Sequence, residues 1–345
     1  CEERYTTVDS KRIAFLRSCA CCSVSNGTET QQLWLYDLES GQAALVCNKV
    51  AGHPASPRYG NTLYFIRITE NSERILTRFD MSSMEQDDVF NMNKAPAWRY
   101  PVCTVSPDER WFVGNYRVRG EIYGLYRIDM KRGNFEFFHE HKEICNPHPQ
   151  FEPAKGNKIL IQLNRGCKLD KEGNLITLVG PKGATLYVID ADGKNECPLP
   201  VGLPYTGHVT GHECWIGKTG RIILTTWTPE YREILDVAPG EKKAKVIWHG
   251  KSFSHIATSD DGRYFISDDT SNGLLYIGSI KTGKVFPLCD TGATSGNPQY
   301  AHTHAYMTPN NKFVIYNSDK TGIGQVYAAE IPSGFLDSLD QPPPH

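Results

Sequence analysis

The stretches HIATSDDGRYFISDDTSNGLLYIGSIKTGKVFPL (255–288) and HAYMTPNNKFVIYNSDKTGIGQVYAAEIP (304–332) follow one pattern. Each starts with a short strand-like run, turns through a Ser/Thr-led segment rich in Asp, Asn or Gly, and continues into further runs of β-branched and aromatic residues. Such runs favour strands, and Gly, Asn and Asp tolerate the backbone of tight turns. A third stretch, CTVSPDERWFVGNYRVRGEIYGLYRIDMKRGNFEFF (103–138), repeats the pattern, which indicates a repeat architecture.

The second residue of this turn recurs along the whole chain at intervals of 43–64 residues. Seven units of three or four strands predict an all-β fold, a single seven-bladed β-propeller over residues 1–345. The longest interval predicts a loop or hairpin inserted at about 168–183 in the fourth blade. An all-β solenoid fits less well, because its coils span only ~20–30 residues, and two sandwiches would not give seven copies of one turn. The recurring positions are Asp9, Pro57, Pro107, Pro153, Gly217, Asp260 and Pro309.

Charge and hydropathy exclude two classes of partner. The 37 Lys and Arg nearly balance the 39 Asp and Glu, for a net charge of −2. A nucleic-acid-binding protein normally carries a basic patch and a basic excess, so no nucleic-acid partner is expected. No apolar run approaches the ~18 residues of a membrane-spanning helix, so no transmembrane segment is expected.

Cysteine usage favours a reducing compartment. The eleven cysteines do not fall into the CxxC…CxxC pattern of a metal site, and most are expected to be reduced, buried, apolar side chains. This predicts a cytoplasmic protein. The alternative is a periplasmic lipoprotein anchored through Cys1, because a mature lipoprotein begins at a lipidated cysteine; a trimmed chain would look the same.

Histidines occupy one position of the repeat. The residue five before the turn position is His148, His212, His255 and His304 in the last four copies, and another residue type in the first three. The first strand of a blade lines the central channel, so these side chains are expected to meet there. His302, two residues before His304, is expected on the same face of the same strand.

The segment QYAHTH (299–304) adds an amide to this set. His255, Gln299, His302 and His304 are candidates for one divalent-cation site. Three imidazoles and an amide oxygen suit Mn²⁺, Fe²⁺, Zn²⁺ or Ni²⁺ better than Mg²⁺ or Ca²⁺, which favour all-oxygen sites.

At these residues the sequence resembles the oligogalacturonate lyases, polysaccharide lyase family 22. The resemblance is carried by HPQFEP (148–153), GHECW (211–215), SHIATSDDG (254–262) and QYAHTHAYMTPNNKFVIYNSD (299–319). It covers the second half of the chain well and the first half only as a propeller repeat.

The resemblance implies a seven-bladed propeller that holds one Mn²⁺ through His255, Gln299, His302 and His304, with His212 as catalytic base. It implies β-elimination on an acidic, uronate-containing oligosaccharide related to pectin fragments, which gives 4,5-unsaturated products. A cation beside the uronate carboxylate and a neutral imidazole suit such a proton abstraction.

Substrate contacts are less closely defined. His148 is a candidate substrate-binding residue. The family also has a substrate-facing arginine before the base; GATLYVIDADG (183–193) contains none, and Arg165 is the candidate here. Two alternatives stay open: a metal-dependent glycoside hydrolase or epimerase on the same fold, and a non-catalytic propeller that serves as a binding scaffold.

Overall fold

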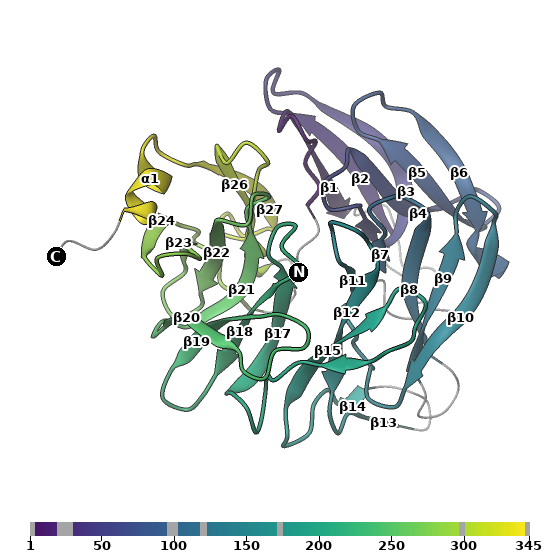
Figure 1. Ribbon diagram of the computed structural model, residues 1–345. Helices are drawn as coiled ribbons and strands as arrows, with labels where there is room; N and C mark the ends of the chain where they lie inside the picture. The colour runs from purple at the N-terminus through teal and green to yellow at the C-terminus, as the bar shows by residue number, and fades with distance from the viewer. Residues whose placement is uncertain are drawn as a thin grey trace. The chain divides into compact units, whose positions relative to one another are not determined.

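The computed structural model describes residues 4–18, 30–94, 103–117, 123–170, 175–296 and 301–341. These residues form antiparallel strands almost throughout (Figure 1), so the all-β prediction is confirmed. The described helices are the 3-10 helix η1 (Met92–Lys94) and the six-residue α1 (Phe335–Asp340). Neither is long and apolar enough to span a membrane.

The chain divides into two compact units. Among the described residues, the N-terminal unit contains 4–181 and 188–196, and the C-terminal unit contains 182–187 and 197–341. Strand β15 (Ala184–Asp190) begins in the C-terminal unit and ends in the N-terminal unit. The two units are therefore described separately.

The N-terminal unit contains a six-stranded sheet in the order β1 to β6, a four-stranded sheet of β7 to β10, and the strands of the fourth repeat. Its strands are β1 (Arg12–Ser18), β2 (Thr30–Asp37), β3 (Ala43–Ala55), β4 (Thr62–Ile68), β5 (Arg74–Asp80), β6 (Gln86–Asn91), β7 (Cys103–Val105), β8 (Trp111–Arg117), β9 (Tyr123–Asp129), β10 (Asn134–His141), β11 (Gln150–Phe151), β12 (Lys158–Asn164), β13 (Lys168–Leu169) and β14 (Leu175–Thr177).

The C-terminal unit contains the meanders β17 to β20, β21 to β24 and β25 to β27. Its strands after β15 are β16 (Cys197–Pro198), β17 (His208–Trp215), β18 (Ile222–Trp227), β19 (Arg232–Val237), β20 (Lys245–His249), β21 (Phe253–Thr258), β22 (Tyr264–Asp269), β23 (Leu274–Ser279), β24 (Val285–Asp290), β25 (Tyr306–Met307), β26 (Phe313–Ser318) and β27 (Gln325–Glu330).

Six of the seven positions read from the sequence lie between the first two strands of their repeat, and Asp9 lies between the isolated bridge residue Thr6 and β1. All lie within a turn except Pro57, which directly precedes one. In four copies a Ser or Thr hydroxyl donates to an Asp or Asn two residues on, over 2.5–2.8 Å, and accepts the N–H five residues on, over 2.9–3.0 Å. These side-chain bonds replace backbone partners and fix the turn. The pairs are Thr7–Asp9, Ser106–Asp108, Ser259–Asp261 and Thr308–Asn310.

The seven expected blades do not appear as seven separate sheets, because the described strands form six sheets. Strand β3 has 13 residues; its first part pairs with β2 and its end pairs with β4, across an irregularity between Ala51 and Ala55. Two repeats are thereby joined into one sheet. The pair Ala184–Val209 likewise connects β15 to β17, and the last sheet has only three strands.

The inserted segment of the fourth repeat is a hairpin. Strands β13 and β14 pair only with each other, in a two-stranded sheet that lies between β12 and β15 in the chain. Both strands lie within the segment of about 168–183 for which the longest interval predicts a loop or hairpin.

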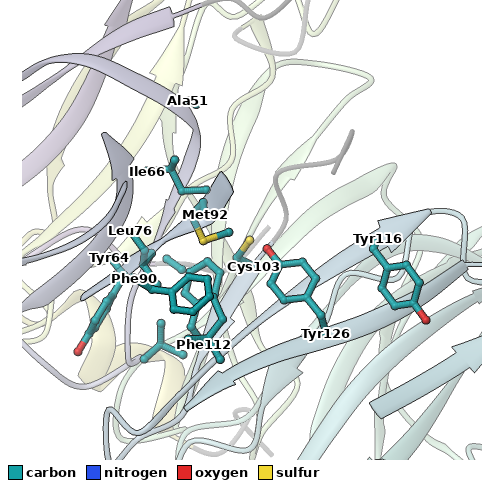
Figure 2. Packing of buried hydrophobic residues seen from close by; sticks show 13 residues of the cluster. Ala51, Tyr64, Ile66, Leu76, Phe90, Met92, Cys103, Phe112, Tyr116 and Tyr126 are labelled. Atoms are coloured by element: carbon teal, nitrogen blue, oxygen red, sulfur yellow. The ribbon is translucent and has the colours of Figure 1, made fainter. Parts of the chain in front are cut away.

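Consecutive sheets pack face to face within each unit. In the N-terminal unit, Ile66, Leu76 and Met92 pack with Phe112 and Tyr126 of the next repeat (Figure 2). The C-terminal unit has two such cores, between the β17–β20 and β21–β24 sheets and between the β21–β24 and β25–β27 sheets. Repeats that bury their apolar faces against the next repeat are typical of propeller blades.

Glycines opposite aromatic residues set the spacing across some strand pairs. Gly278 is paired with Phe265 on the neighbouring strand, and a Cβ at Gly278 would fall inside the Phe265 ring. Gly114 opposite Tyr126 repeats this arrangement in the third repeat.

We expect Gly278→Val to lower the free energy of unfolding by roughly 1–3 kcal/mol, because the added side chain must displace Phe265 from a closed core. Gly296→Ala is the matched control, since the nearest atom to its added Cβ is 3.4 Å away. Urea unfolding of both variants measures the difference. Equal stabilities would contradict this packing argument.

Helix α1 is attached to the sixth repeat through Asp340. The carboxylate accepts hydrogen bonds from the Tyr264 hydroxyl at 2.7 Å and the Ser279 hydroxyl at 3.0 Å, and it pairs with Arg263. Leu339 beside it is fully buried. Burial opposes ionisation of Asp340, but the three donors hold the pKa of its carboxyl below its usual value.

The lowered pKa of Asp340 makes the stability of the fold depend on pH. Because the pKa of Asp340 is lower in the folded than in the unfolded protein, its contribution is complete above about pH 3.9 and is lost as the pH falls through the folded value. We expect Asp340→Asn to reduce the free energy of unfolding at neutral pH by about 1–2 kcal/mol, and less at pH 3. Asp337→Asn, at an exposed position of the same helix, should change it by no more than a few tenths. A pH-independent effect of Asp340→Asn would contradict the ionic role.

Candidate metal centre and active site

Three histidines of the C-terminal unit converge. His255, His302 and His304 each offer a ring nitrogen, and these atoms lie within 4.8 Å of one another. The ring centroid of His255 lies 4.1 Å from that of His304 and 5.3 Å from that of His302. It is the only such group of three or more His, Cys, Asp or Glu found among the described residues.

His255 is held rigidly by Asp268 of the neighbouring strand. One carboxylate oxygen accepts the backbone N–H of His255 and the other lies 2.8 Å from Nδ1. Both side chains are buried, with 5% and 3% of their surface exposed. An Nδ1–H that donates to this carboxylate leaves the lone pair on Nε2, and Nε2 is buried without a hydrogen-bond partner.

An irregularity in strand pairing gives His255 this position. The register of β21 against β22 shifts between Phe253 and Ile256, so His255 lies inside a bulge. Bulges re-aim side chains and are common beside functional sites.

The expectation that His302 and His304 share a face of one strand is wrong. Strand β25 begins only at Tyr306, and both histidines lie in the irregular segment before it. His304 has φ 41°, a left-handed conformation that is costly for a non-glycine residue. Their rings nevertheless lie nearly parallel, with centroids 5.8 Å apart. The irregular backbone of this segment, rather than the alternation of a strand, therefore brings the two rings together.

His212 lies beside the group without belonging to it. Its ring centroid is 4.2 Å from that of His255, at an interplanar angle of 58°. It follows Gly211, which has φ 90°, in a second bulge where β17 shifts register against β18. The ring is half-buried, so it can face a substrate.

The three-histidine group fits a divalent transition metal. Nitrogen ligands lie about 2.0–2.2 Å from such an ion, so those of one ion are at most about 4.4 Å apart. A separation of up to 4.8 Å needs only small side-chain rotations. The Nε2 atom of His255 is buried without a hydrogen-bond partner, so its lone pair is available to bind a metal ion. Three protein ligands would leave coordination positions of the ion open for water or substrate.

The remaining predicted residues are placed as follows. Gln299 and Cys1 lie outside the described residues. His148 and Arg165 lie in the N-terminal unit, whereas the histidine group lies in the C-terminal unit. His148 has φ 44°, close to that of His304, and like His304 it lies two residues before a strand. Burial lowers the pKa of the half-buried Arg165, and Glu143 opposes this shift.

Asp268 is the site residue that sequence reasoning missed. The sequence feature that could have revealed it is the pair of acidic residues at the end of YFISDD (264–269), the segment that forms the fully buried strand β22. A carboxylate in a buried strand requires a partner, and a histidine at the repeat position of the preceding strand was the available one.

No protein-family model matches the chain. An oligogalacturonate lyase of Dickeya dadantii (strain 3937) is 22% identical, over 87% of this chain and 83% of that protein. A solved oligogalacturonate lyase in complex with manganese has a TM-score of 0.72 and 18% identity, covering 97% of this chain and 89% of that one. The β-propeller domain of the Trilobed protease from Pyrococcus furiosus has a TM-score of 0.56 and 12% identity, covering 95% and 92%. The resemblance predicted from the motifs is confirmed, and the fold is β-propeller-like.

We expect Asp268→Asn to weaken the binding of a divalent transition metal about 10–100-fold, because the substituted side chain no longer places a negative charge on Nδ1–H of His255. Titration of the metal-free protein with Mn²⁺ or Zn²⁺, followed by calorimetry, measures this. Asp269→Asn is the control, since the carboxylate of Asp269 instead accepts bonds from Ser271. Equal affinities of the two variants would contradict the assigned role of Asp268.

Proposed function

We propose that this chain is a divergent oligogalacturonate lyase, a metal-dependent enzyme that cleaves uronate-containing oligosaccharides by β-elimination. The observation that carries the proposal is the group of His255, His302 and His304, with His212 beside it. The similarity to oligogalacturonate lyases over most of the chain, one of them solved with manganese, supports the same activity.

The cation in this proposal is a single Mn²⁺. His255, His302 and His304 would hold it through ring nitrogens, and Gln299 would add an amide oxygen. When bound, the cation supplies positive charge beside the uronate carboxylate, which makes the neighbouring C5 proton more acidic. Asp268 keeps the Nε2 lone pair of His255 available for it.

His212 is the base in the proposed reaction. Its neutral imidazole takes the C5 proton of the uronate; the C5–H electron pair forms the C4–C5 double bond, and the C4–O bond breaks. The oxygen released from C4 takes a proton from the protonated imidazole or from solvent. The products are a saturated fragment with a new hydroxyl and a fragment ending in a 4,5-unsaturated uronate. A half-buried ring in contact with His255 can reach a substrate at the metal centre without serving as a ligand itself.

Substrate binding includes His148 and Arg165 in this proposal. A guanidinium can pair with a uronate carboxylate through two hydrogen bonds. The half-buried side chain of Arg165 keeps its charge, because the pKa of an arginine stays far above neutral pH even when burial lowers it.

We also propose that the seven repeats form the seven blades of one propeller over residues 1–345. Seven turns at equivalent positions support this, as do the apolar cores between consecutive sheets of each unit.

We expect His212→Ala to lower the turnover of oligogalacturonate by ~10²-fold or more, the usual contribution of a general base, while metal content and unfolding midpoint stay unchanged. The ultraviolet absorbance of the unsaturated product measures turnover, and metal analysis is done on the same samples. His249→Ala, an exposed histidine of β20, is the matched control.

The other outcomes separate the alternatives. Loss of metal in His212→Ala would make His212 a ligand rather than a base. Cleavage of a uronate substrate without the unsaturated product would indicate a hydrolase, and epimerised product an epimerase. Bound metal without turnover of any uronate oligosaccharide would contradict the lyase proposal.

A further inference from the structure

Two cysteines of the N-terminal unit lie in adjacent loops beside the inserted hairpin. Cys145 lies in the loop after β10 and is 3% exposed, whereas Cys167 follows β12 and is half-buried. Backbone and side-chain bonds hold the two loops together: the N–H of Asn164 donates to the carbonyl of Glu143 at 2.6 Å, and the N–H of Gly166 donates to Glu143 Oε1 at 2.6 Å.

Each of the two thiols donates to a backbone carbonyl. Cys167 donates to the carbonyl of Lys142 at 3.7 Å, and Cys145 to that of Leu178 at 3.8 Å, so each sulfur lies against the other's loop or the hairpin. The neighbouring Cys145 thiol holds the pKa of Cys167 below its usual value, and interaction with Cys167, together with burial, raises the pKa of Cys145. Cys167 is thus the accessible nucleophile of the pair and Cys145 the protected second thiol.

We propose that Cys145 and Cys167 are a reactive dithiol site, which a small disulfide oxidant of the oxidised-glutathione class converts into an intramolecular cystine. The Cys167 thiolate attacks one sulfur of the oxidant, forms a mixed disulfide and releases one thiolate. Cys145 then loses its proton and attacks the Cys167 sulfur, which releases the second thiolate. Two protein thiols are oxidised and one disulfide is reduced to two thiols, so atoms and electrons balance.

The surroundings favour this pair over other described cysteines. Burial raises the pKa of Cys47 and of Cys289, which keeps both as unreactive thiols at neutral pH. The two segments are already fixed side by side by backbone bonds, so a cystine between them requires little rearrangement of the chain.

The cystine would join two segments that the proposed function uses. Cys145 lies three residues before His148, and Cys167 lies two residues after Arg165. Oxidation would therefore tie together the loops that carry both proposed substrate contacts. This consequence rests on the proposed function, whereas formation of the cystine does not.

Peptide mapping tests the pair directly. The folded protein is incubated with oxidised glutathione, free thiols are alkylated, and trypsin is added. The expected product links EICNPHPQFEPAK (143–155) to GCK (166–168) and disappears on reduction. Cys145→Ser should accumulate a stable glutathione adduct at Cys167, because the second thiol is missing. Cys197→Ser, at another half-buried cysteine, should still form the linked peptide.

Three results would overturn the proposal. The wild-type protein could keep the glutathione adduct on Cys167. Cys167 could be linked chiefly to another cysteine. The linked peptide could be absent while other cysteines react. None of them bears on lyase activity, which is assayed separately on reduced protein, so failure of this proposal and failure of the proposed function are distinguishable.

Discussion

The contact between Asp268 and His255 determines what the histidine group can do. One carboxylate fixes both the backbone N–H and the ring Nδ1 of the same residue, inside a bulge of β21. The ring can therefore present only Nε2 to His302 and His304. Without the carboxylate, a buried imidazole could take either tautomer, and one of the two would point a proton, rather than a lone pair, at the same place.

The repeated strands and turns position the two residues of this contact, and local departures from strand geometry bring the histidines of the site together. In four copies a hydroxyl-led turn fixes where the second strand begins, so residues five positions before these turns occupy equivalent places. At that position the backbone leaves ideal strand geometry in several copies: Gly52 and His304 have positive φ, and His255 lies in a bulge. Regular alternation would send neighbouring side chains to opposite faces; the departures let close-set histidines face one another.

Sequence reasoning recovered the parts that depend on spacing. The seven turns and the convergence of His212, His255, His302 and His304 followed from counting along the repeat, because one fold unit recurs with nearly constant length. Sequence reasoning failed for features that depend on how strands pair with one another. The long strand β3 joins two repeats into one sheet, and the irregular segment before β25 carries two histidines that were expected on a strand. Asp268 was missed because its partner lies on the neighbouring strand, 13 residues away in the chain.

Pulsed electron paramagnetic resonance of the Mn²⁺-loaded protein shows whether imidazoles of the C-terminal unit hold the cation. We expect one Mn²⁺ per chain, with echo modulation from the ¹⁴N nuclei of several coordinated imidazoles. This modulation should weaken when His302 and His304 are both replaced by alanine. A spectrum that shows only water and carboxylate coordination, unchanged in that double variant, would contradict metal binding by these histidines.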